Sequence, residues 1–298
     1  MFDVAFEKIA LIGIGLIGSS LARVIRSKNL ADHISIATHS ENTLNEAREL
    51  GLGDSYTTIN SEAVKDADLI IISVPVGASG AVARDIARCL KKGAIVTDVG
   101  SVKASVIAQM QPELPHDIHF IPGHPIAGTE YSGPSAGFAT LFVNRWCILT
   151  PLPGTDQEML KRLSAFWIAC GSKIDHLDPE YHDLVLAIIS HVPHIIAYNI
   201  IGTARDFEKV NNSRVLAYSA SGFCDFTRLA SSDPTMWRDV CLYNRDAILE
   251  MLGRFGEDLA LLQSAIRGGD GDALFDLFTR ARIIRRSIVE SEQDISVP

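Results

Sequence analysis

The sequence predicts an α/β protein in which a doubly wound parallel sheet is followed by an all-helical domain. The first half alternates short runs rich in Val, Ile and Leu with amphipathic stretches, as buried parallel strands alternate with covering helices. From Asp178-Pro179 onward the chain shows long helical patterns and no strand pattern. We therefore predict two domains, residues 1–178 and residues 179–298.

The elements of both domains follow from these periodicities. Strands are expected at Ile9–Gly13, Ile34–Thr38, Leu69–Val74, Ala94–Val99 and His119–Pro122. Helices between them are expected at Leu16–Ser27, Glu41–Leu50, Ala78–Leu90 and Val102–Met110. A helix at Asp156–Cys170 and a strand at Lys173–Leu177 complete the first domain. The second domain is expected to contain helices at Tyr181–Thr203, Met236–Ala265 and Asp272–Ser287, with a glycine-rich turn at 268–271.

The composition is that of a globular protein, with 47% hydrophobic and 21% charged residues. A net charge of −9 argues against a nucleic-acid partner, which would need a basic face. The five cysteines are scattered and form no CxxC pair, so no metal site or redox pair is expected. No apolar run reaches the ~18 residues that span a bilayer, and the N-terminus lacks the basic start of a signal peptide. We expect a cytoplasmic protein without a membrane partner.

A glycine-rich segment stands where a dinucleotide would bind. Gly13-Ile14-Gly15-Leu16-Ile17-Gly18 follows an expected strand and opens an expected helix. In that context the first glycine makes a tight turn, the second lets a pyrophosphate approach the backbone, and the third lets helix and strand pack closely. We expect the cofactor to contact Gly13, Gly15, Leu16, Ile17 and Gly18. The alternative is a plain strand–helix turn.

The end of the second expected strand bears on the choice of nucleotide. Thr38, His39 and Ser40 stand there, without the acidic residue that usually binds the ribose hydroxyls of NAD. Hydroxyl donors and an imidazole suit a 2′-phosphate, so NADP is expected to be preferred and NAD to be used more weakly. The other residues expected to contact the cofactor follow later strands at the same edge: Val74, Pro75 and Ser101.

A histidine lies between a glycine and a proline in Gly123-His124-Pro125, after the last strand expected at this edge. Neither neighbour suits a helix interior or a central strand. We therefore expect a stiff loop that aims His124 at the cofactor side of the sheet, as a candidate for chemistry. The alternative is a turn with an incidental histidine.

The first helix of the second domain has a polar stripe. At 100° per residue, Asp183, His191 and His194 fall on one face of an otherwise apolar helix. Such a stripe is costly unless it is partnered or lines a wet cleft, so a structural Asp–His pair is the alternative to a binding site. Pro193 is expected to kink the helix. His182 points away from the stripe and is expected at the surface.

Two arginines follow in the next segments, Arg228 and Arg238. The guanidinium group is a fork-shaped donor that suits carboxylates. An ion pair is the alternative for either residue, and it is the preferred interpretation for Arg238.

Five ordered segments carry a resemblance to one known family: GIGLIGSS (13–20), DVGSVK (98–103), GHPIAGTE (123–130), YHDLVLAIISHVPH (181–194) and GFCDFTRLASSDPTMWRD (222–239). Through essentially its whole length the chain resembles the prephenate/arogenate (cyclohexadienyl) dehydrogenases of tyrosine biosynthesis. The resemblance implies a Rossmann domain followed by a helical dimerisation domain, with the active site between them. It implies a homodimer that oxidatively decarboxylates prephenate and/or arogenate by hydride transfer to NAD(P).

The resemblance also implies a role for each site residue. His124 matches the histidine that hydrogen-bonds the ring hydroxyl of the substrate, and Ser101 matches the serine that supports it. Arg228 matches the arginine that binds a substrate carboxylate. The other matching positions form a cleft network and its entrance: His191, His194, Asp183, Thr129 and Glu130. Cys224 stands where many relatives carry Lys or Arg, so a charged contact at the pocket mouth is expected to be missing.

Two other functions fit parts of the sequence. A β-hydroxyacid dehydrogenase of the same two-domain plan uses a lysine on the interdomain helix, where this chain has His191 and His194 and no lysine. A non-catalytic nucleotide sensor would not need His124, Ser101 and Arg228 to meet in one cleft.

Overall fold

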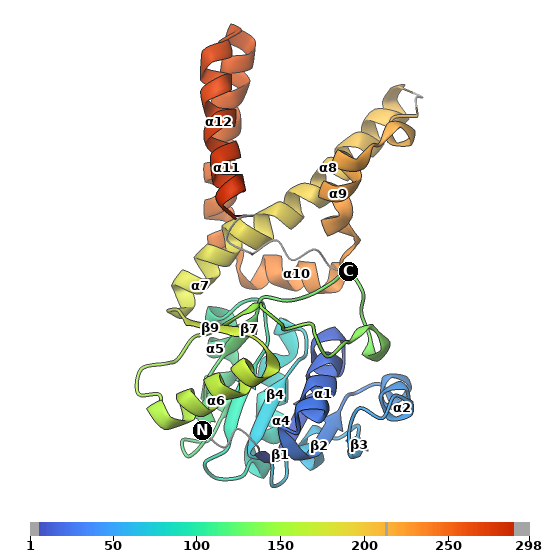
Figure 1. Cartoon of the computed structure of the whole chain (residues 1–298), viewed down its shortest axis with the longest axis vertical. Helices are drawn as coiled ribbons and strands as arrows, with labels where there is room; N and C mark the ends of the chain where they lie inside the picture. Colours follow the sequence, from blue (N-terminus) through green and yellow to red (C-terminus); the bar gives the residue numbers. More distant parts are fainter. Residues whose placement is uncertain (1–5, 212–213, 289–298) are drawn as a thin grey trace. The chain divides into compact units, whose positions relative to one another are not determined.

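The computed structural model describes residues 6–211 and 214–288, and the predicted fold class is confirmed (Figure 1). By its internal contacts the chain divides into one unit that runs through Ile248 and another that begins at Leu249. The predicted boundary between residues 178 and 179 falls inside the first unit and stays a prediction. Each unit is described by itself below.

The main sheet of the first unit is parallel throughout. Its strands are β1 (Phe6–Ile12), β2 (Ala31–Ala37), β3 (Ser55–Thr57), β4 (Leu69–Ile72), β5 (Ile95–Asp98) and β6 (His119–Phe120). Their order is β3-β2-β1-β4-β5-β6. The order reverses direction beside β1, and ligands of such sheets bind at the carboxyl ends of the strands at this point. β3 was not predicted, because three half-buried residues give no periodic signal.

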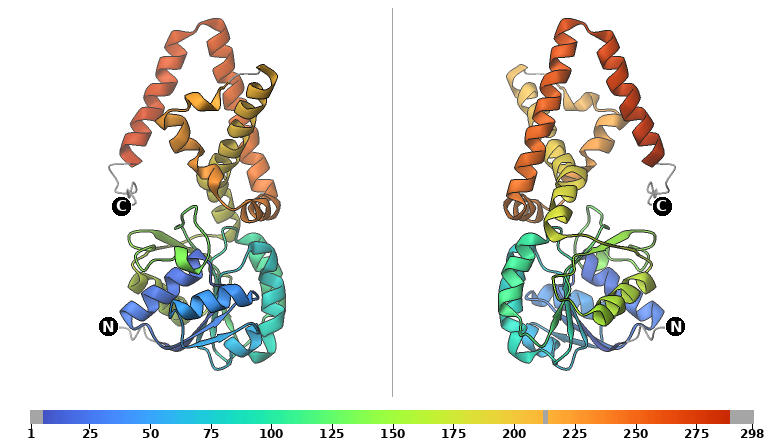
Figure 2. Two further views of the ribbon diagram at one scale, coloured as in Figure 1. Left: turned by 90° about the vertical axis from the view of Figure 1, so that its right-hand side faces the viewer. Right: turned by 90° about the vertical axis from the view of Figure 1, so that its left-hand side faces the viewer.

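Helices cover both faces of this sheet. They are α1 (Leu16–Lys28), α2 (Glu41–Glu49), α3 (Asn60–Ala63), α4 (Ser79–Ile86), α5 (Ala104–Met110) and α6 (Gln157–Cys170). α1 contacts α6 and α4 contacts α5, and Figure 2 shows the two pairs on opposite faces. Side chains that accept backbone N–H bonds start two of the helices, Ser40 for α2 and Asp156 for α6. The predicted helices are therefore confirmed to within a few residues.

A second, three-stranded sheet corrects one expectation. It contains β7 (Gly123–Pro125), β8 (Trp146–Leu149) and β9 (Lys173–His176), in that order. The expected loop around His124 is thus a short strand, with His124 opposite Ile148 in the antiparallel pair. Pro125 is tolerated because β7 lies at an edge of its sheet, where a missing N–H leaves no ladder bond unmade.

The helices that follow residue 178 begin with one long run. It consists of α7 (Pro179–Leu186), a π-helical turn (Ala187–His191) and α8 (Val192–Asn211). Pro193 has no N–H to donate, and its ring would crowd the carbonyl of Ile189 in a regular helix. The π-turn stands directly before the proline, where the sequence predicts a kink. α9 (Ser221–Thr227) and α10 (Pro234–Tyr243) follow.

The single helix expected over Met236–Ala265 is wrong. The chain breaks at Asn244, between α10 and α11 (Arg245–Gly268). The predicted glycine-rich turn is confirmed: Gly269 has a φ of 65°, and α12 (Gly271–Ile288) follows it (Figure 2). In the second unit, α11 from Leu249 onward and α12 expose several large apolar side chains, Leu261 and Phe275 among them.

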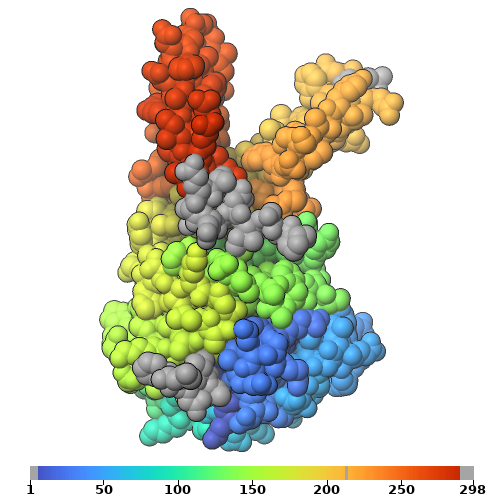
Figure 3. Space-filling view, in the orientation of Figure 1, coloured from blue at the N-terminus to red at the C-terminus, as the bar shows by residue number. Residues whose placement is uncertain are grey.

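Short 3₁₀ turns complete the described chain: Val76–Ala78, Ala87–Cys89, Gln111–Glu113, Pro134–Ala136, Leu216–Tyr218 and Arg228–Ser231. The segment around Pro134–Ala136 covers α1, as the green atoms over the blue ones show in Figure 3. Phe138 N–H donates to the Ser20 hydroxyl there at 3.1 Å.

Polar residues such as Ser190 and His191 interrupt the helical run Pro179–Asn211, so no unbroken apolar run of ~18 residues stands there, as expected. By the mean hydropathy of 1.8 over a window of 18 residues, the run is nevertheless long and apolar enough to cross a membrane. Core helices of soluble proteins pass the same test. This run also carries His182, Asp183 and His191, whose buried side chains are hydrogen-bonded inside the first unit.

Candidate active site

His124 is buried on β7, and the backbone beside it is held from two sides. On one side β7 pairs with β8. On the other, Gly123 N–H donates to Asp98 Oδ1 at 3.3 Å, and Lys103 Nζ donates to the Gly123 carbonyl at 2.6 Å. The strand that carries the histidine is therefore fixed by backbone pairing and by two side chains from the end of β5.

Those two side chains form a fully buried ion pair that sequence reasoning missed. Lys103 has no exposed surface, Asp98 is 1% exposed, and Lys103 Nζ donates to Asp98 Oδ2. Both residues lie in the DVGSVK segment that carried the family resemblance, which was the available signal. Burying two charges is costly, so such a pair is retained where it fixes an arrangement rather than where it adds net stability.

His182 is buried beside His124, so its expected place at the surface is wrong. It has no exposed surface, and its Nε2 lies 2.9 Å from Nδ1 of His124. Its Nδ1 lies 2.8 Å from Asp183 Oδ1. Helical periodicity predicts the direction in which a side chain leaves the helix axis, but it does not predict which part of the protein packs on that side. Here α7 is buried on the side of His182 as well as on the side of Asp183.

Asp183 docks α7 onto the start of α5. Its carboxylate accepts from the backbone N–H of Lys103 at 2.7 Å and of Ala104 at 3.0 Å. These are first-turn donors that lack partners within the helix. Its backbone carbonyl accepts from Asn244 Nδ2 at 2.9 Å. With the His182 ring, Asp183 thus binds four protein partners, as the structural alternative to a ligand contact expects.

His191 and His194, the other members of the predicted stripe, lie against Trp237. The same Asn244 amide nitrogen lies 3.0 Å from His191 Nδ1, while His191 Nε2 is buried without a partner among the described residues. The His194 ring stacks on Trp237 with centroids 3.9 Å apart, and its Nδ1 lies 2.9 Å from the Ser190 carbonyl. Asn244 thus links Asp183 to His191, and Trp237 contacts both histidines of the stripe.

Burial keeps these histidines uncharged near neutral pH. It lowers the pKa of His124 well below the usual range and lowers the pKa of His191 to about 4. Burial is also the largest cause that lowers the pKa of His182 and of His194. A neutral imidazole has one lone pair, so each ring has one nitrogen that accepts a proton or a hydrogen bond.

Arg228 and Glu130, two of the predicted site residues, lie next to each other. Arg228 Nη1 lies 3.5 Å from Glu130 Oε2, and the arginine side chain is 60% exposed. Its positive charge is also close enough to lower the pKa of His194, after the larger effect of burial. An exposed ion pair of this kind stabilises by at most ~1 kcal/mol, so the guanidinium is open to a better acceptor.

The remaining predicted residues are less closely tied to His124. Ser101 lies between β5 and α5 and makes no hydrogen bond to His124 within the described chain. The Thr129 hydroxyl accepts from Tyr131 N–H at 3.3 Å. Cys224 is exposed on α9. Arg238 donates two bonds to Asp239, so the ion pair preferred for it is confirmed.

The glycine loop has the geometry that its spacing predicts. Gly13 has a φ of 91°, and a Cβ there would lie 2.4 Å from the Ser73 carbonyl oxygen. A Cβ on Gly18 would lie 2.2 Å from the Gly13 oxygen, whereas one on Gly15 would meet no atom of the described residues within 4 Å. Among the residues that the structure describes, no side chain caps the first turn of α1, and that turn holds no acidic residue. The open glycine and the uncapped N–H groups fit a pyrophosphate.

The side chains at the end of β2 stand in three different settings. Thr38 is buried, His39 is exposed, and Ser40 Oγ accepts from Thr43 N–H at 3.3 Å as the cap of α2. Val74 and the exposed Pro75 follow β4 at the same edge. The nearby arginines of α1 have other partners, since Arg26 pairs with Asp54 and Arg23 donates to the Pro134 carbonyl.

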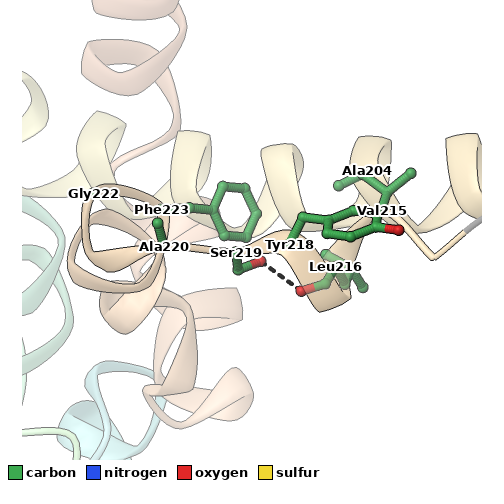
Figure 4. A pocket seen from close by; sticks show the side chains of 8 residues that line it. All are labelled: Ala204, Val215, Leu216, Tyr218, Ser219, Ala220, Gly222 and Phe223. Carbon is green, nitrogen blue, oxygen red and sulfur yellow. Dashed lines mark hydrogen bonds between the residues drawn. The ribbon is translucent and has the colours of Figure 1, made fainter.

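A separate hollow lies between α8 and α9 (Figure 4). Tyr218 and Phe223 contribute its apolar lining, and the Ser219 hydroxyl donates to the Leu216 carbonyl at 2.8 Å. None of the predicted site residues lines it.

Comparison with known proteins identifies the family. Residues 21–176 match the model of the prephenate dehydrogenase nucleotide-binding domain, and residues 178–280 match that of the prephenate dehydrogenase dimerization domain. The chain belongs to the prephenate dehydrogenase family. The family prediction is confirmed, and with it the prediction of an oxidoreductase, which decides against the β-hydroxyacid dehydrogenase and the non-catalytic sensor.

Relatives within the family cover nearly the whole chain. A cyclohexadienyl dehydrogenase of Zymomonas mobilis is 42% identical over 290 residues, which are 97% of this chain and 98% of that protein. A prephenate dehydrogenase of Bacillus subtilis is 32% identical over 280 residues, 94% of this chain and 75% of that protein.

Solved structures of the family superpose closely. Prephenate dehydrogenase from Aquifex aeolicus, solved with hydroxyphenyl propionate and NAD+, has a TM-score of 0.87 at 30% identity and covers 95% of this chain and 98% of its own. Synechocystis arogenate dehydrogenase has a TM-score of 0.78 at 29% identity and covers 94% and 99%.

Proposed function

We propose that this enzyme oxidatively decarboxylates prephenate, arogenate or both, giving 4-hydroxyphenylpyruvate or tyrosine and reduced NAD(P). The observation that carries the proposal is a buried, neutral histidine, His124, just beyond the carboxyl edge of a sheet whose glycine loop fits a dinucleotide. Family membership over both matched ranges supports it. Relatives named for prephenate, arogenate and cyclohexadienyl substrates leave either acid as the substrate.

His124 is proposed to act as the base. Hydride loss from the carbon that bears the substrate's 4-hydroxyl, together with loss of the ring carboxylate as CO₂, leaves an aromatic phenol. The chain must orient the ring and polarise that hydroxyl, and a positioned base contributes ~10²–10⁴-fold to such a step. Ser101 is proposed to support His124.

Arg228 is proposed to bind a substrate carboxylate in place of Glu130, its partner at 3.5 Å. The Nε2 of His191, which has no partner among the described residues, and the half-buried ring of His194 are further candidates for ligand contacts. The proposed binding residues also include Asp183, which acts indirectly by holding the backbone at the start of α5, and Thr129 on the entrance side.

A bound nicotinamide supplies the hydride acceptor. The residues proposed to hold the dinucleotide are those of the glycine loop and the neighbouring strand ends: Gly13, Gly15, Leu16, Ile17, Gly18, Thr38, His39, Ser40, Val74, Pro75 and Ser101. NADP is proposed to be the preferred form. Glu41 opens α2 and is exposed, so it stands as a first-turn acid rather than as a ribose ligand. Ser40 accepts from Thr43 N–H, which leaves its own O–H free to donate to a 2′-phosphate.

The enzyme is proposed to work as a homodimer in the cytoplasm. The matched dimerization domain and the exposed apolar side chains of α8, α11 and α12 support the dimer. Sedimentation at micromolar concentration tests it, and a monomer there would contradict it.

The deciding experiment follows reduced nicotinamide by absorbance with prephenate or arogenate and either nucleotide. The proposal expects turnover of at least one acid and a higher kcat/KM with NADP. No turnover of either acid would overturn the function. A tenfold preference for NAD, equivalent to about 1.4 kcal/mol in the opposite direction, would overturn only the nucleotide choice.

A further inference from the structure

His182 joins two side chains into one hydrogen-bonded chain. Its Nε2 faces Nδ1 of His124 at 2.9 Å, and its Nδ1 faces Asp183 Oδ1 at 2.8 Å. All three residues are buried, and the two imidazole planes stand at 64° with centroids 5.1 Å apart. The function proposed above uses His124 and leaves His182 without a role.

The partners of this chain determine where each proton lies. The Asp183 carboxylate already accepts from the backbone N–H groups of Lys103 and Ala104, so the His182 nitrogen that faces it is the donor, Nδ1–H. In a neutral ring the lone pair of His182 is then on Nε2, and the His124 nitrogen that faces it must donate. Neutral His124 therefore carries its proton on Nδ1 and its lone pair on Nε2.

We infer that His182 is a positioning residue, held by Asp183, that fixes His124 in the Nδ1–H tautomer so that Nε2 is the atom that accepts the proton of the substrate. This inference rests on the proposed role of His124 as the base. When the substrate O–H bond breaks, its proton goes to Nε2 of His124, and the new positive charge is shared through the Nδ1–H bond to His182. The other tautomer would present Nε2–H to the substrate and could not accept.

The charged and titratable groups around His124 affect its pKa and therefore the pH dependence of activity. Lys103, His182 and His191 each lower the pKa of His124 when positively charged, in addition to the larger effect of burial. Asp183 and Asp98 act on His182 in the opposite direction. Because burial keeps His182 itself neutral, it acts on His124 near neutral pH as a hydrogen-bond acceptor and not as a charge. Loss of this acceptor leaves the imidazolium form of His124 less stabilised, so the pKa of His124 should fall further and the acid limb of activity should move to lower pH.

The same contacts would also arise if His182 only helped α7 to pack. Asp183, however, docks α7 through backbone N–H groups that do not involve His182. Removal of the His182 ring therefore leaves that anchor in place, and a packing role and a positioning role can be separated by substitution.

Three substitutions separate the two contacts of the ring. The amide of His182→Gln reaches the position of Nε2, where its oxygen can accept from His124. The shorter amide of His182→Asn reaches only the position of Nδ1 and keeps the contact with Asp183, and His182→Leu keeps neither. His176→Gln removes an exposed histidine of β9 and is the matched control.

We expect the Leu and Asn variants to lose ~10–100-fold in kcat, part of what a positioned base contributes. Their KM and nucleotide Kd should stay within about twofold of wild type. The Gln variant should recover much of the lost kcat, the Leu variant should shift its acid limb to lower pH, and the control should match wild type. A loss of kcat below threefold in both the Leu and Asn variants would overturn the inference. So would a Gln variant no better than Asn, or a loss matched by weaker nucleotide binding.

Histidine ¹⁵N NMR tests the same inference without turnover. The His124 resonances, identified by comparison with His124→Asn, should show an unprotonated Nε2 in wild type and a mixture of tautomers in His182→Leu. A protonated Nε2 in wild type would overturn the tautomer assignment. If wild type oxidised neither acid while the NMR result held, the proposed function would fail and the hydrogen-bonded chain would stand.

Discussion

The glycine loop allows one prediction in which fold and ligand binding separate cleanly. In Gly18→Ala the new Cβ would lie 2.2 Å from the Gly13 carbonyl oxygen and 3.1 Å from its carbon. Gly13 cannot retreat, because its own backbone passes against the Ser73 carbonyl at a φ of 91°. α1 must therefore shift away from β1, and we expect a cost of about 3 kcal/mol, the upper end of the range for overpacking. At roughly 2–4 °C per kcal/mol, the Tm should fall by about 6–12 °C.

Gly15→Ala should behave in the opposite way. Its Cβ would meet no atom within 4 Å, and the backbone at φ −71° and ψ −159° is open to alanine. The free energy of unfolding should stay within about 1 kcal/mol of wild type, since the loss at the cap is offset by lower entropy of the unfolded chain. The methyl group would stand where the pyrophosphate approaches, so nucleotide Kd should rise at least tenfold, or about 1.4 kcal/mol.

Thermal unfolding and nucleotide titration of the two variants form the assay. Tight nucleotide binding by Gly15→Ala would show that the dinucleotide does not bind against this loop. A Gly18→Ala protein as stable as wild type would show that the close contact between α1 and Gly13 is not rigid.

Other variants test the site itself. His124→Asn should lower kcat by ~10²–10⁴-fold with unchanged nucleotide Kd, and near-wild-type turnover would refute its role as base. Arg228→Ala should raise KM roughly ten- to a hundredfold without unfolding the chain, and an unchanged KM would place the carboxylate elsewhere. Lys103→Met should cost about 3–5 kcal/mol because it leaves Asp98 buried and unpaired, whereas Lys161→Met, at an exposed pair, should cost ~0.5 kcal/mol or less; equal costs would contradict the buried pair. The pKa of His191 is lowered in the folded chain from its ordinary value of 6.5 to about 4. Between pH 6.5 and about 4, the unfolded chain therefore binds a proton at His191 that the folded chain does not bind. Stability should therefore fall as pH drops through this window, by up to roughly 1.4 kcal/mol per unit for this group, and urea unfolding of His191→Gln should show a shallower fall.

Most strands and helices of the main sheet domain were predictable because their signals are local. Apolar strands such as β1 and β4, and caps such as Ser40 and Asp156, specify their elements within a few residues. β7 was not predictable in this way. Gly123 and Pro125 argue against a central strand, and only the distant pairing with β8 makes this segment an edge strand.

The glycine loop and Arg228 were predicted from the sequence, but the hydrogen-bonded network that joins His124 to His182 and Lys103 was not. Helical periodicity ranked Asp183 above His182 because it assumes one buried face, and α7 is buried on two. The helix break at Asn244 was not predicted for a related reason. The Asn244 amide bonds the Asp183 carbonyl and lies beside His191, and both partners stand about 50–60 positions earlier in the chain. No local sequence pattern encodes such contacts.

These long-range contacts close into a ring. Lys103 donates from its backbone to Asp183, Asp183 accepts from His182, His182 accepts from His124, and the residue before His124 accepts from the Lys103 side chain. One residue therefore sets both the place of α7 and the place of β7. Since α7 continues into the π-turn that ends at His191 and then into α8, which bears His194, the ring ties the proposed base to the proposed substrate-binding side within one unit. An ion pair that is costly to bury is explained here by the geometry that Lys103 fixes.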